Sequence, residues 1–366
     1  MKFALLTVLI ISIFSCTLKV DAVSVSAKAA VVINGDTAEV IYSHNSDARL
    51  PMASTTKIMT ALLLCEQNTP KREITVTKEM VAVEGSSMGL LVGDKVTFRG
   101  LLYGMLLASG NDAANTAAIA IDGSVSAFVE RMNDKAYELG LRNTHFETPS
   151  GLDGDEHYTT AYELALLAKY ALSNEQFAMA AASQYETLYY GNPPYRRTLK
   201  NHNRLLSMYD GAMGVKTGFT EKSGRCLVSA AKRDGEFVIA VTLDAPDDWN
   251  DHKKLLDYGF NQIKQTVLSN GENFIVPCAE NGKSLKASYD TITLNLKDSE
   301  GIQKRVSIPH FTYGDIKKGA TIGKVEFYKN NECIYSTELI AQNSVKTDFD
   351  KLECLKNIFM SIFSYI

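Results

Sequence analysis

The chain has 366 residues and a formal net charge of -4, with 45% hydrophobic and 22% charged residues. This length predicts two or three domains, and the balance of apolar and charged residues is typical of a soluble protein with a well-formed core. The sequence has no block of basic residues and no basic patch interleaved with aromatic residues. We therefore expect no nucleic-acid partner.

Residues 1–22 have the features of an export signal. Lys2 supplies a positive start, and residues 3–14 form an almost continuous apolar run that is too short to span a bilayer. Small residues ending at Ala22 offer a cleavage site. An alternative is a lipoprotein signal ending at Cys16, although Phe14 stands where such a signal needs a small residue. We expect cleavage after Ala22 and an exported protein.

The remaining cysteines predict neither a disulfide framework nor a metal site. They are odd in number, widely spaced, and absent from any Cys-x-x-Cys pair or Cys/His cluster. Most are therefore interpreted as small buried hydrophobic residues. No metal and no organic cofactor is expected. These cysteines are Cys65, Cys226, Cys278, Cys333 and Cys354.

Residues 23–268 are predicted to form a first domain in which helices pack on an antiparallel sheet. Strand-like runs alternate with apolar or amphipathic segments, and turn dipeptides such as Asp234-Gly235 join two of the strands as a hairpin. Strands are expected at residues 29–33, 40–43, 72–83, 226–231 and 237–243. Helices are expected from residue 54, at 101–108, from 112, at 126–139, 160–172 and 249–263, with loops at 144–158 and 189–197.

The pattern changes near Gly271. Residues 269–344 alternate in polarity between turn residues and predict a small all-β domain that contains no convincing chemical cluster. Residues 345–366 carry apolar side chains at helical spacing. This tail is predicted to be an amphipathic helix, which either packs on the β domain or in an oligomer, or lies on a membrane surface as an anchor. The sequence leaves these alternatives open.

Three short motifs lie in the first domain in an informative order. Ser54-x-x-Lys57 opens an apolar helix, so that one helical turn puts both side chains on the same face near an electropositive helix end. Ser109-Gly110-Asn111 falls between two helices, and Lys216-Thr217-Gly218 precedes a hairpin. The first two patterns also occur by chance, at Ser229 and Lys232 and at Ser43-His44-Asn45, whereas Lys-Thr-Gly occurs once in the chain. The ordered trio is the motif set of serine β-lactamases and penicillin-binding proteins.

Around this trio the chain resembles the D-alanyl-D-alanine carboxypeptidases, the low-molecular-mass penicillin-binding proteins of serine peptidase family S11. The stretches at 201–206 and 214–224, and Gly151-Leu152-Asp153, are also similar to that family. The resemblance covers residues 25–340 and implies a β-lactamase/transpeptidase-like α/β domain followed by a small all-β domain and an amphipathic C-terminal helix. It implies removal of the terminal D-alanine from peptidoglycan stem peptides that end in D-Ala-D-Ala, with β-lactams as covalent inhibitors.

The resemblance also implies a role for each motif residue. Ser54 would be the nucleophile that forms an acyl-enzyme, Lys57 would take its proton, and Ser109 would relay a proton to the leaving amine. Asn111 would hold the substrate amide and orient Lys57. Substrate-binding roles fall on Asn111, Lys216, Thr217, Gly218 and Phe219, with Lys216 and Thr217 on the terminal carboxylate.

The backbone N–H groups of Ser54 and Phe219 would form the oxyanion hole. Because peptidoglycan lies outside the cytoplasm, the resemblance implies that the enzyme works in the cell wall or at the outer face of the cytoplasmic membrane. The β domain would act as a spacer above the membrane.

Three alternatives remain at this point. Gly85-Ser86-Ser87-Met88-Gly89 fits the Gly-x-Ser-x-Gly nucleophile elbow of another class of hydrolase, although no convincing helix start follows it. A β-lactamase of the same fold would need a loop glutamate to activate water, and Glu147 lies in the corresponding region. A non-catalytic cell-wall-binding protein could retain the fold.

Overall fold

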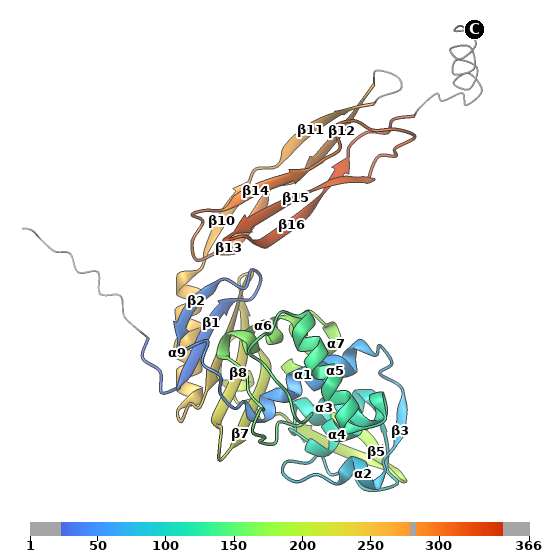
Figure 1. The fold of residues 1–366 in the computed structure, drawn as a ribbon, viewed down its shortest axis with the longest axis vertical. Helices are drawn as coiled ribbons and strands as arrows, with labels where there is room; N and C mark the ends of the chain where they lie inside the picture. Colours follow the sequence, from blue (N-terminus) through green and yellow to red (C-terminus); the bar gives the residue numbers. More distant parts are fainter. Residues whose placement is uncertain (1–22, 279–282, 347–366) are drawn as a thin grey trace, which may run out of the picture.

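The computed structural model describes residues 23–278 and 283–346, which form two domains (Figure 1). The predicted export signal, with Cys16, and nearly all of the predicted amphipathic tail, with Cys354, lie outside the described residues. Within the described ranges, no helix combines the length and the apolar character needed to cross a bilayer. The antiparallel pairing in both domains confirms the predicted fold class.

A five-stranded antiparallel sheet in the order β2-β1-β9-β8-β7 is the centre of the first domain. The strands of the two predicted hairpins pair as expected, β1 with β2 and β8 with β9. Because β7 lies at one end of this order, it is an edge strand. The strands are β1 (Ala29–Asn34), β2 (Val40–His44), β7 (Ala212–Thr220), β8 (Gly224–Arg233) and β9 (Glu236–Leu243).

Helices cover both faces of this sheet. Successive residues of β1 enter two different apolar clusters, Val31 on the side of the helical core and Val32 on the side of α9, as the two-residue period of a strand requires. The predicted helices are present with shifted ends, and neither α7 nor α8 was predicted. The helices are α1 (Lys57–Glu66), α3 (Phe98–Leu106), α4 (Asn111–Asp122), α5 (Val125–Glu138), α6 (Ala161–Leu172), α7 (Glu175–Ala182), α8 (Leu205–Met208) and α9 (Asp248–Gln262).

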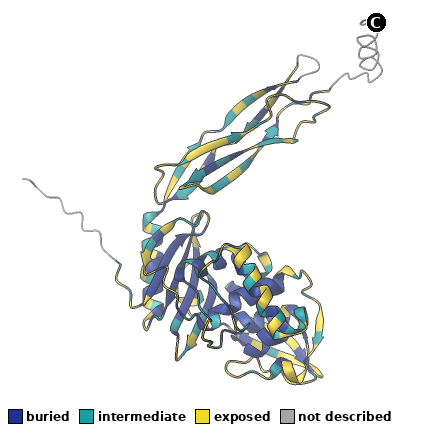
Figure 2. Ribbon diagram, in the orientation of Figure 1, coloured by how far each residue is buried: buried dark blue, intermediate teal, exposed yellow. Residues whose placement is uncertain are grey.

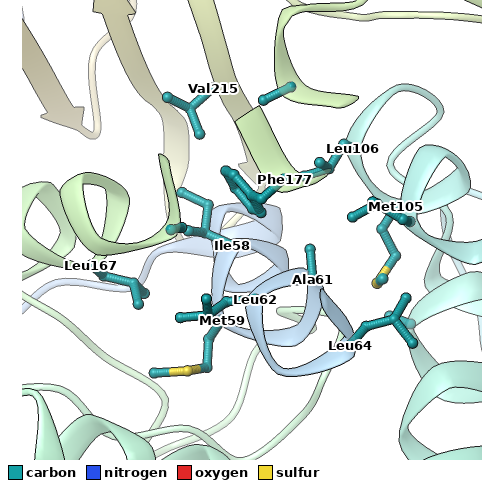
Figure 3. Packing of buried hydrophobic residues seen from close by; sticks show 14 of the residues in the cluster. Ile58, Met59, Ala61, Leu62, Leu64, Met105, Leu106, Leu167, Phe177 and Val215 are labelled. Atoms are coloured by element: carbon teal, nitrogen blue, oxygen red, sulfur yellow. The ribbon is translucent and has the colours of Figure 1, made fainter. Parts of the chain in front are cut away.

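Helix α1 lies at the centre of the helical core (Figure 3). Nine of its ten residues are buried, and its apolar side chains meet Met105, Leu167, Phe177 and Val215 from the surrounding elements. A helix that is apolar on all sides is stable only inside a core. The apolar run that follows the Ser54 motif is therefore the reason that this motif has a fixed position.

Two predictions in this domain are wrong. Residues 189–197 form a hairpin rather than a loop, because β5 and β6 pair on both sides of Pro193 and Pro194 starts the second strand, where its missing N–H is tolerated. Residues 72–83 are divided between a short strand and a helix. The corrected elements are β3 (Glu73–Thr75), α2 (Lys78–Val81), β4 (Lys95–Thr97), β5 (Tyr185–Gly191) and β6 (Pro194–Lys200), whose strands form a four-stranded sheet.

The second domain consists of strands, with β11-β12-β16-β15-β14 in one sheet and β10 paired with β13. Because β10 begins at Lys264 and pairs within this domain, we propose that the domains meet at Ile263 rather than after residue 268. The strands are β10 (Lys264–Ser269), β11 (Glu272–Pro277), β12 (Ser284–Tyr289), β13 (Ile292–Leu296), β14 (Gln303–Ser307), β15 (Thr321–Lys329) and β16 (Glu332–Ala341).

Polar contacts join the two domains near the β1–β2 turn. Lys329 Nζ lies 2.8 Å from Glu39 Oε1, and both side chains are largely shielded from solvent. Asn34 Nδ2 donates to Asn295 O, and Lys297 Nζ donates to Ile41 O. The end of the β domain that carries these contacts is therefore fixed against the central sheet.

Candidate active site

Ser54 lies in a single 3-10 turn, η1 (Ala53–Thr56), directly before α1. The turn starts from an unusual backbone, since Ala53 has a φ of 47°. Positive φ values are uncommon for residues other than glycine and occur preferentially at functional sites. The Ser54 side chain is therefore presented from a tight turn that is anchored at its other end by the buried helix.

Two glycines allow other segments to approach this turn closely. A Cβ on Gly151 would collide with the carbonyl group of Ala53, and a Cβ on Gly218 would lie 3.1 Å from Ser54 N. No side chain fits at Gly151, and one at Gly218 would require its neighbours to shift by a few tenths of an ångström. As a result, the backbone of β7 passes directly beside the backbone N–H of Ser54.

Lys57 is completely buried and has three polar partners. Its Nζ lies 2.8 Å from Ser54 Oγ, 2.7 Å from Asn111 Oδ1 and 2.6 Å from the carbonyl oxygen of Ser150. The last two atoms can only accept hydrogen bonds. A neutral amine would therefore donate its two hydrogens to these oxygens, and its lone pair would point at the Ser54 hydroxyl.

The orientation of the Asn111 amide is fixed from its other side. Asn111 Nδ2 donates to Glu84 O at 2.6 Å, so its Oδ1 must face Lys57. The backbone N–H of Asn111 donates to Ser86 O. The loop at residues 84–86 therefore positions the group that holds the lysine.

Lys216 lies on the edge strand β7 and is also buried. Its Nζ donates to Ser109 Oγ at 3.0 Å and to Thr217 O at 2.7 Å. Residue 109 occupies the turn between α3 and α4 with a φ of 57°. The second and third sequence motifs, which are far apart in the chain, therefore meet through one hydrogen bond.

Burial changes the protonation of both lysines, because a charged amine is poorly solvated inside a protein. The pKa of Lys57 lies well below its ordinary value, chiefly through burial and then through the nearby charge of Lys216, while Asp112 acts in the opposite direction. Burial lowers the pKa of Lys216 to about 7. Both shifts favour the neutral amine, which is the form in which Lys57 can accept a proton.

A cavity of about 260 Å³ opens above these groups. It exposes Ser54 and Ser109 together with Thr217 to Phe219, whereas Lys57, Asn111 and Lys216 are buried beside it. Phe219 is 64% exposed at its rim. The structure therefore brings together every site residue that the sequence predicted.

The same cavity is lined by residues that the sequence analysis did not select. Arg225 Nη2 forms an ion pair at 2.9 Å with the buried carboxylate of Asp248, and its guanidinium lies over the Trp249 ring. Arg225 pairs with Phe219 across β7 and β8. No sequence signal marks Arg225, Asp248 or Trp249, because a lone arginine in a strand resembles any surface residue. His202 and Ser86 complete this set.

Asp112 organises the segment that carries the Gly-x-Ser-x-Gly pattern. Its Oδ2 accepts from Ser87 Oγ at 2.6 Å, and its two oxygens also accept from the backbone N–H groups of Met88, Gly89 and Leu90. Residues 82–94 form no helix, and the short strand β4 follows them. The nucleophile-elbow alternative is therefore wrong, since such a serine must stand between a strand and a helix.

A buried histidine supports the Ser54 turn from below. Glu147 N donates to His157 Nδ1 at 2.9 Å, which leaves the hydrogen on Nε2, 2.8 Å from Thr56 Oγ1. The Thr56 hydroxyl in turn donates to Ala53 O at 2.8 Å. This chain of donors and acceptors needs one tautomer of a neutral imidazole, and burial lowers the pKa of His157 to about 4.

Glu147, the candidate water-activating group of the β-lactamase alternative, points away from the cavity. It is exposed, and its Oε2 accepts from Glu156 N at 3.0 Å. It is not among the residues that line the cavity. This geometry does not support the β-lactamase alternative.

Comparisons with known proteins identify the family of this chain. The D-alanyl-D-alanine carboxypeptidase family model matches residues 17–247, and that of the penicillin-binding protein 5 C-terminal domain matches residues 264–347. The D-alanyl-D-alanine carboxypeptidase DacF of Bacillus subtilis is 33% identical over 335 residues, covering 87% of this chain and 86% of that protein. The D-alanyl-D-alanine carboxypeptidase DacC of Escherichia coli is 30% identical over 91% of this chain and 88% of its own length.

Solved structures of DD-peptidases are also similar to this chain. The DD-transpeptidase of Streptomyces K15 has a TM-score of 0.63 and 35% identity, covering 65% of this chain and 98% of its own. The D-alanyl-D-alanine carboxypeptidase DacD of Francisella tularensis has a TM-score of 0.64 and 27% identity, covering 89% of this chain and 95% of its own. The chain therefore belongs to the D-alanyl-D-alanine carboxypeptidase family, the serine peptidases of family S11.

Proposed function

We propose that this protein is a serine-type D-Ala-D-Ala carboxypeptidase that removes the terminal D-alanine from peptidoglycan stem peptides through an acyl-enzyme on Ser54. The observation that carries this proposal is the set of partners around Lys57. Two carbonyl oxygens hold the amine, and the third partner is the Ser54 hydroxyl. A buried amine with this geometry is suited to be the base for one particular hydroxyl.

In the proposed reaction, Ser54 Oγ attacks the carbonyl carbon of the penultimate D-alanine while its proton moves to Lys57 Nζ. A new ester bond forms as the peptide bond breaks, and the leaving D-alanine needs one proton on its nitrogen. Ser109 would relay this proton, since its hydroxyl lies 3.0 Å from Lys216 Nζ and lines the same cavity as Ser54. Water then hydrolyses the ester and releases the shortened peptide.

The residues around the cavity would bind the substrate. Asn111 would hold the substrate amide, and Lys216 with Thr217 would bind the terminal carboxylate. We add Arg225 to this set, because it brings a fixed cation to the same cavity and guanidinium groups bind carboxylates in a bidentate manner. Gly218 and Phe219 would provide the backbone edge along which the peptide lies.

The oxyanion hole would consist of the backbone N–H groups of Ser54 and Phe219. The close approach of Gly218 to Ser54 N supports this assignment, since it brings the two segments within reach of one substrate oxygen. One such donor is typically worth about 3–4 kcal/mol of transition-state stabilisation.

The same acyl-enzyme explains the other expected partners. A β-lactam would acylate Ser54 and act as a covalent inhibitor, because it presents a strained amide to the same nucleophile. We further propose that the protein is exported and works in the cell wall or at the outer face of the cytoplasmic membrane. Residues 345–366 would provide membrane contact there.

The test is release of free D-alanine from an N-acylated peptide ending in D-Ala-D-Ala. We expect release by the native protein and by Ser87→Ala, and none by Ser54→Ala. Ser87 is a matched control because it lies in the competing motif. Rapid, sustained nitrocefin hydrolysis without D-alanine release would instead indicate a β-lactamase, and neither activity would indicate a non-catalytic binding protein.

A further inference from the structure

An exposed pair of aromatic rings stands at the end of the β domain that is remote from the active site. Phe311 and Tyr313 are 48% and 64% exposed, and their rings pack edge to face with centroids 5.0 Å apart. Ile275, on the edge strand β11, is 71% exposed. Apolar groups concentrated on an exposed surface often mark an interaction site.

The backbone presents this pair in a fixed direction. Thr312, between the two aromatic residues, is buried, and its N–H donates to Pro277 O at 3.0 Å. Thr312 also forms an isolated parallel bridge with Cys278. Because neighbouring side chains in extended backbone point to opposite sides, burial of Thr312 turns Phe311 and Tyr313 outward.

This tip lies opposite the junction between the domains (Figure 1). Strand β15 runs from Thr321, next to the loop that carries the aromatic pair, to Lys329, which contacts Glu39 of the first domain. Figure 2 shows exposed residues along much of the β domain, in contrast to the buried centre of the first domain. The aromatic pair is therefore separated from the active site by the length of the β domain.

The described residues around the pair carry more basic than acidic side chains. We define the basic tip as residues 275–278, 283–286, 308–320 and 342–346. Asp315 is the acidic residue of this set, against five lysines, which are all exposed. These lysines are Lys283, Lys286, Lys317, Lys318 and Lys346.

The described part of the β domain ends with Lys346 at this same tip. Ile316 and Val345 exchange two backbone hydrogen bonds of 2.9 Å, so Lys346 lies beside the loop that carries the aromatic pair. The next residues of the sequence are those with apolar side chains at helical spacing. The basic tip and this predicted amphipathic segment are therefore directly connected.

We propose that the basic tip itself contacts an anionic lipid surface, with Phe311 and Tyr313 at the level of the headgroups and the lysines facing anionic phosphates. Aromatic rings favour the interface between membrane and water, and lysines near an anionic leaflet add attraction that salt weakens. The excess of lysine favours this partner over a second copy of the chain, whose tip would carry the same charge. The proposal is independent of the carboxypeptidase activity.

The experiment places a fluorescent residue at the tip of the full-length chain. The protein contains one tryptophan, Trp249, in the first domain, so the native protein supplies the background. Tyr313→Trp is compared with Tyr185→Trp, an exposed tyrosine of strand β5 in the first domain. Both variants are mixed with vesicles of phosphatidylglycerol and brominated phosphatidylcholine.

We expect quenching of the added fluorescence to roughly half or less at position 313, and little change at position 185, because lipid bromine quenches only an indole that comes almost into contact with the bilayer, where aromatic rings favour the interface. The double variant Phe311→Ser/Tyr313→Ser should bind the same vesicles at least about fivefold more weakly, and high salt should also weaken binding. Labelling by a fluorescent penicillin would show that each variant is folded.

Three results would overturn the proposal. The first is vesicle binding without quenching at position 313, which would leave the contact to residues 347–366 alone. The second is equal binding to vesicles made only of phosphatidylcholine. The third is that the native protein sediments as a dimer and the Phe311→Ser/Tyr313→Ser variant as a monomer. This result would identify the aromatic pair as a contact between two copies of the chain.

Discussion

The two domains differ most clearly in what they bury. The first domain encloses charged side chains, including Lys57, Lys216, Asp112 and Asp248, within an extensive apolar core. In the described part of the second domain, the apolar clusters are small, and ion pairs such as Lys304–Glu272 lie at the surface. Burial of charge is costly unless partners are organised around it.

This difference indicates that the two domains have different tasks. The core around α1 stabilises the first domain enough to hold two amines away from water, and burial lowers the pKa of both. The β domain holds no comparable group among its described residues, and its conspicuous features lie on its surface. We infer that catalysis belongs to the first domain and that placement of the enzyme belongs to the second.

The largest expected effect comes from removing the buried base. Lys57→Met should slow acylation of Ser54 by about 10³-fold, since general-base catalysis contributes 10²–10⁴-fold. Stopped-flow measurement with a fluorescent penicillin would give the rate. Methionine fills the space of the lysine without burying a charge, so circular dichroism should show a folded protein.

Lys232→Met is the matched control for this variant. Lys232 belongs to the second Ser-x-x-Lys sequence and is exposed on β8, so its replacement should leave the acylation rate unchanged. Retention of acylation within tenfold of the native rate in Lys57→Met would show that another group acts as the base.

The next largest effect is expected at Asp112, which positions the loop behind Asn111. Asp112→Asn should slow acylation by roughly 10–100-fold, because an amide nitrogen would then face backbone N–H groups that need an acceptor. It should also move the acid limb of the rate profile to lower pH, since the carboxylate raises the pKa of Lys57. Asp134→Asn, an exposed position on α5, is the control. A slower rate without that shift would contradict the proposed effect of the Asp112 carboxylate on the pKa of Lys57.

Acidification should destabilise the first domain through its buried histidines. His157 has its pKa lowered to about 4 from 6.5, so between these values the unfolded chain binds more protons than the folded one. Stability is thus retained above pH 6.5 and should fall on acidification by up to about 1.4 kcal/mol per pH unit for this group. Urea unfolding of native protein and His157→Gln at several pH values measures the slope. An equal slope in both proteins would contradict the assignment.

The smallest effect is expected at the junction between the domains. Lys329→Met removes a shielded ion pair with Glu39 and should cost about 1 kcal/mol or less. Acylation of Ser54 by a soluble penicillin should stay unchanged, while small-angle scattering should show a wider distribution of domain orientations. A large loss of acylation would show that the β domain contributes to the chemistry, and catalysis would then not belong to the first domain alone.

The structure brings the predicted site residues together, whereas parts of the surrounding fold differ from the prediction. The apolar run after Ser54 requires a buried helix, and the trio of motifs needs only spacing and order to be found. Residues 189–197 were misinterpreted because two prolines and several polar residues resemble a loop, whereas pairing across the turn forms a hairpin. Tertiary pairing of this kind overrides local preference.

The residues that complete the site left no local signal. The Ser150 carbonyl reaches Lys57 across 93 positions of the chain, and His157 reaches Thr56 across 101. A backbone carbonyl has no sequence signature, and a single histidine or aspartate has no periodicity. Only the fold brings such groups together.

The most direct test of the central claim is peptide mapping by mass spectrometry after exposure of the purified protein to benzylpenicillin. We expect one adduct, on the peptide that contains Ser54, and we expect it to form much more slowly in Lys57→Met. An adduct on the peptide that contains Ser87, or no adduct on a folded protein, would contradict it.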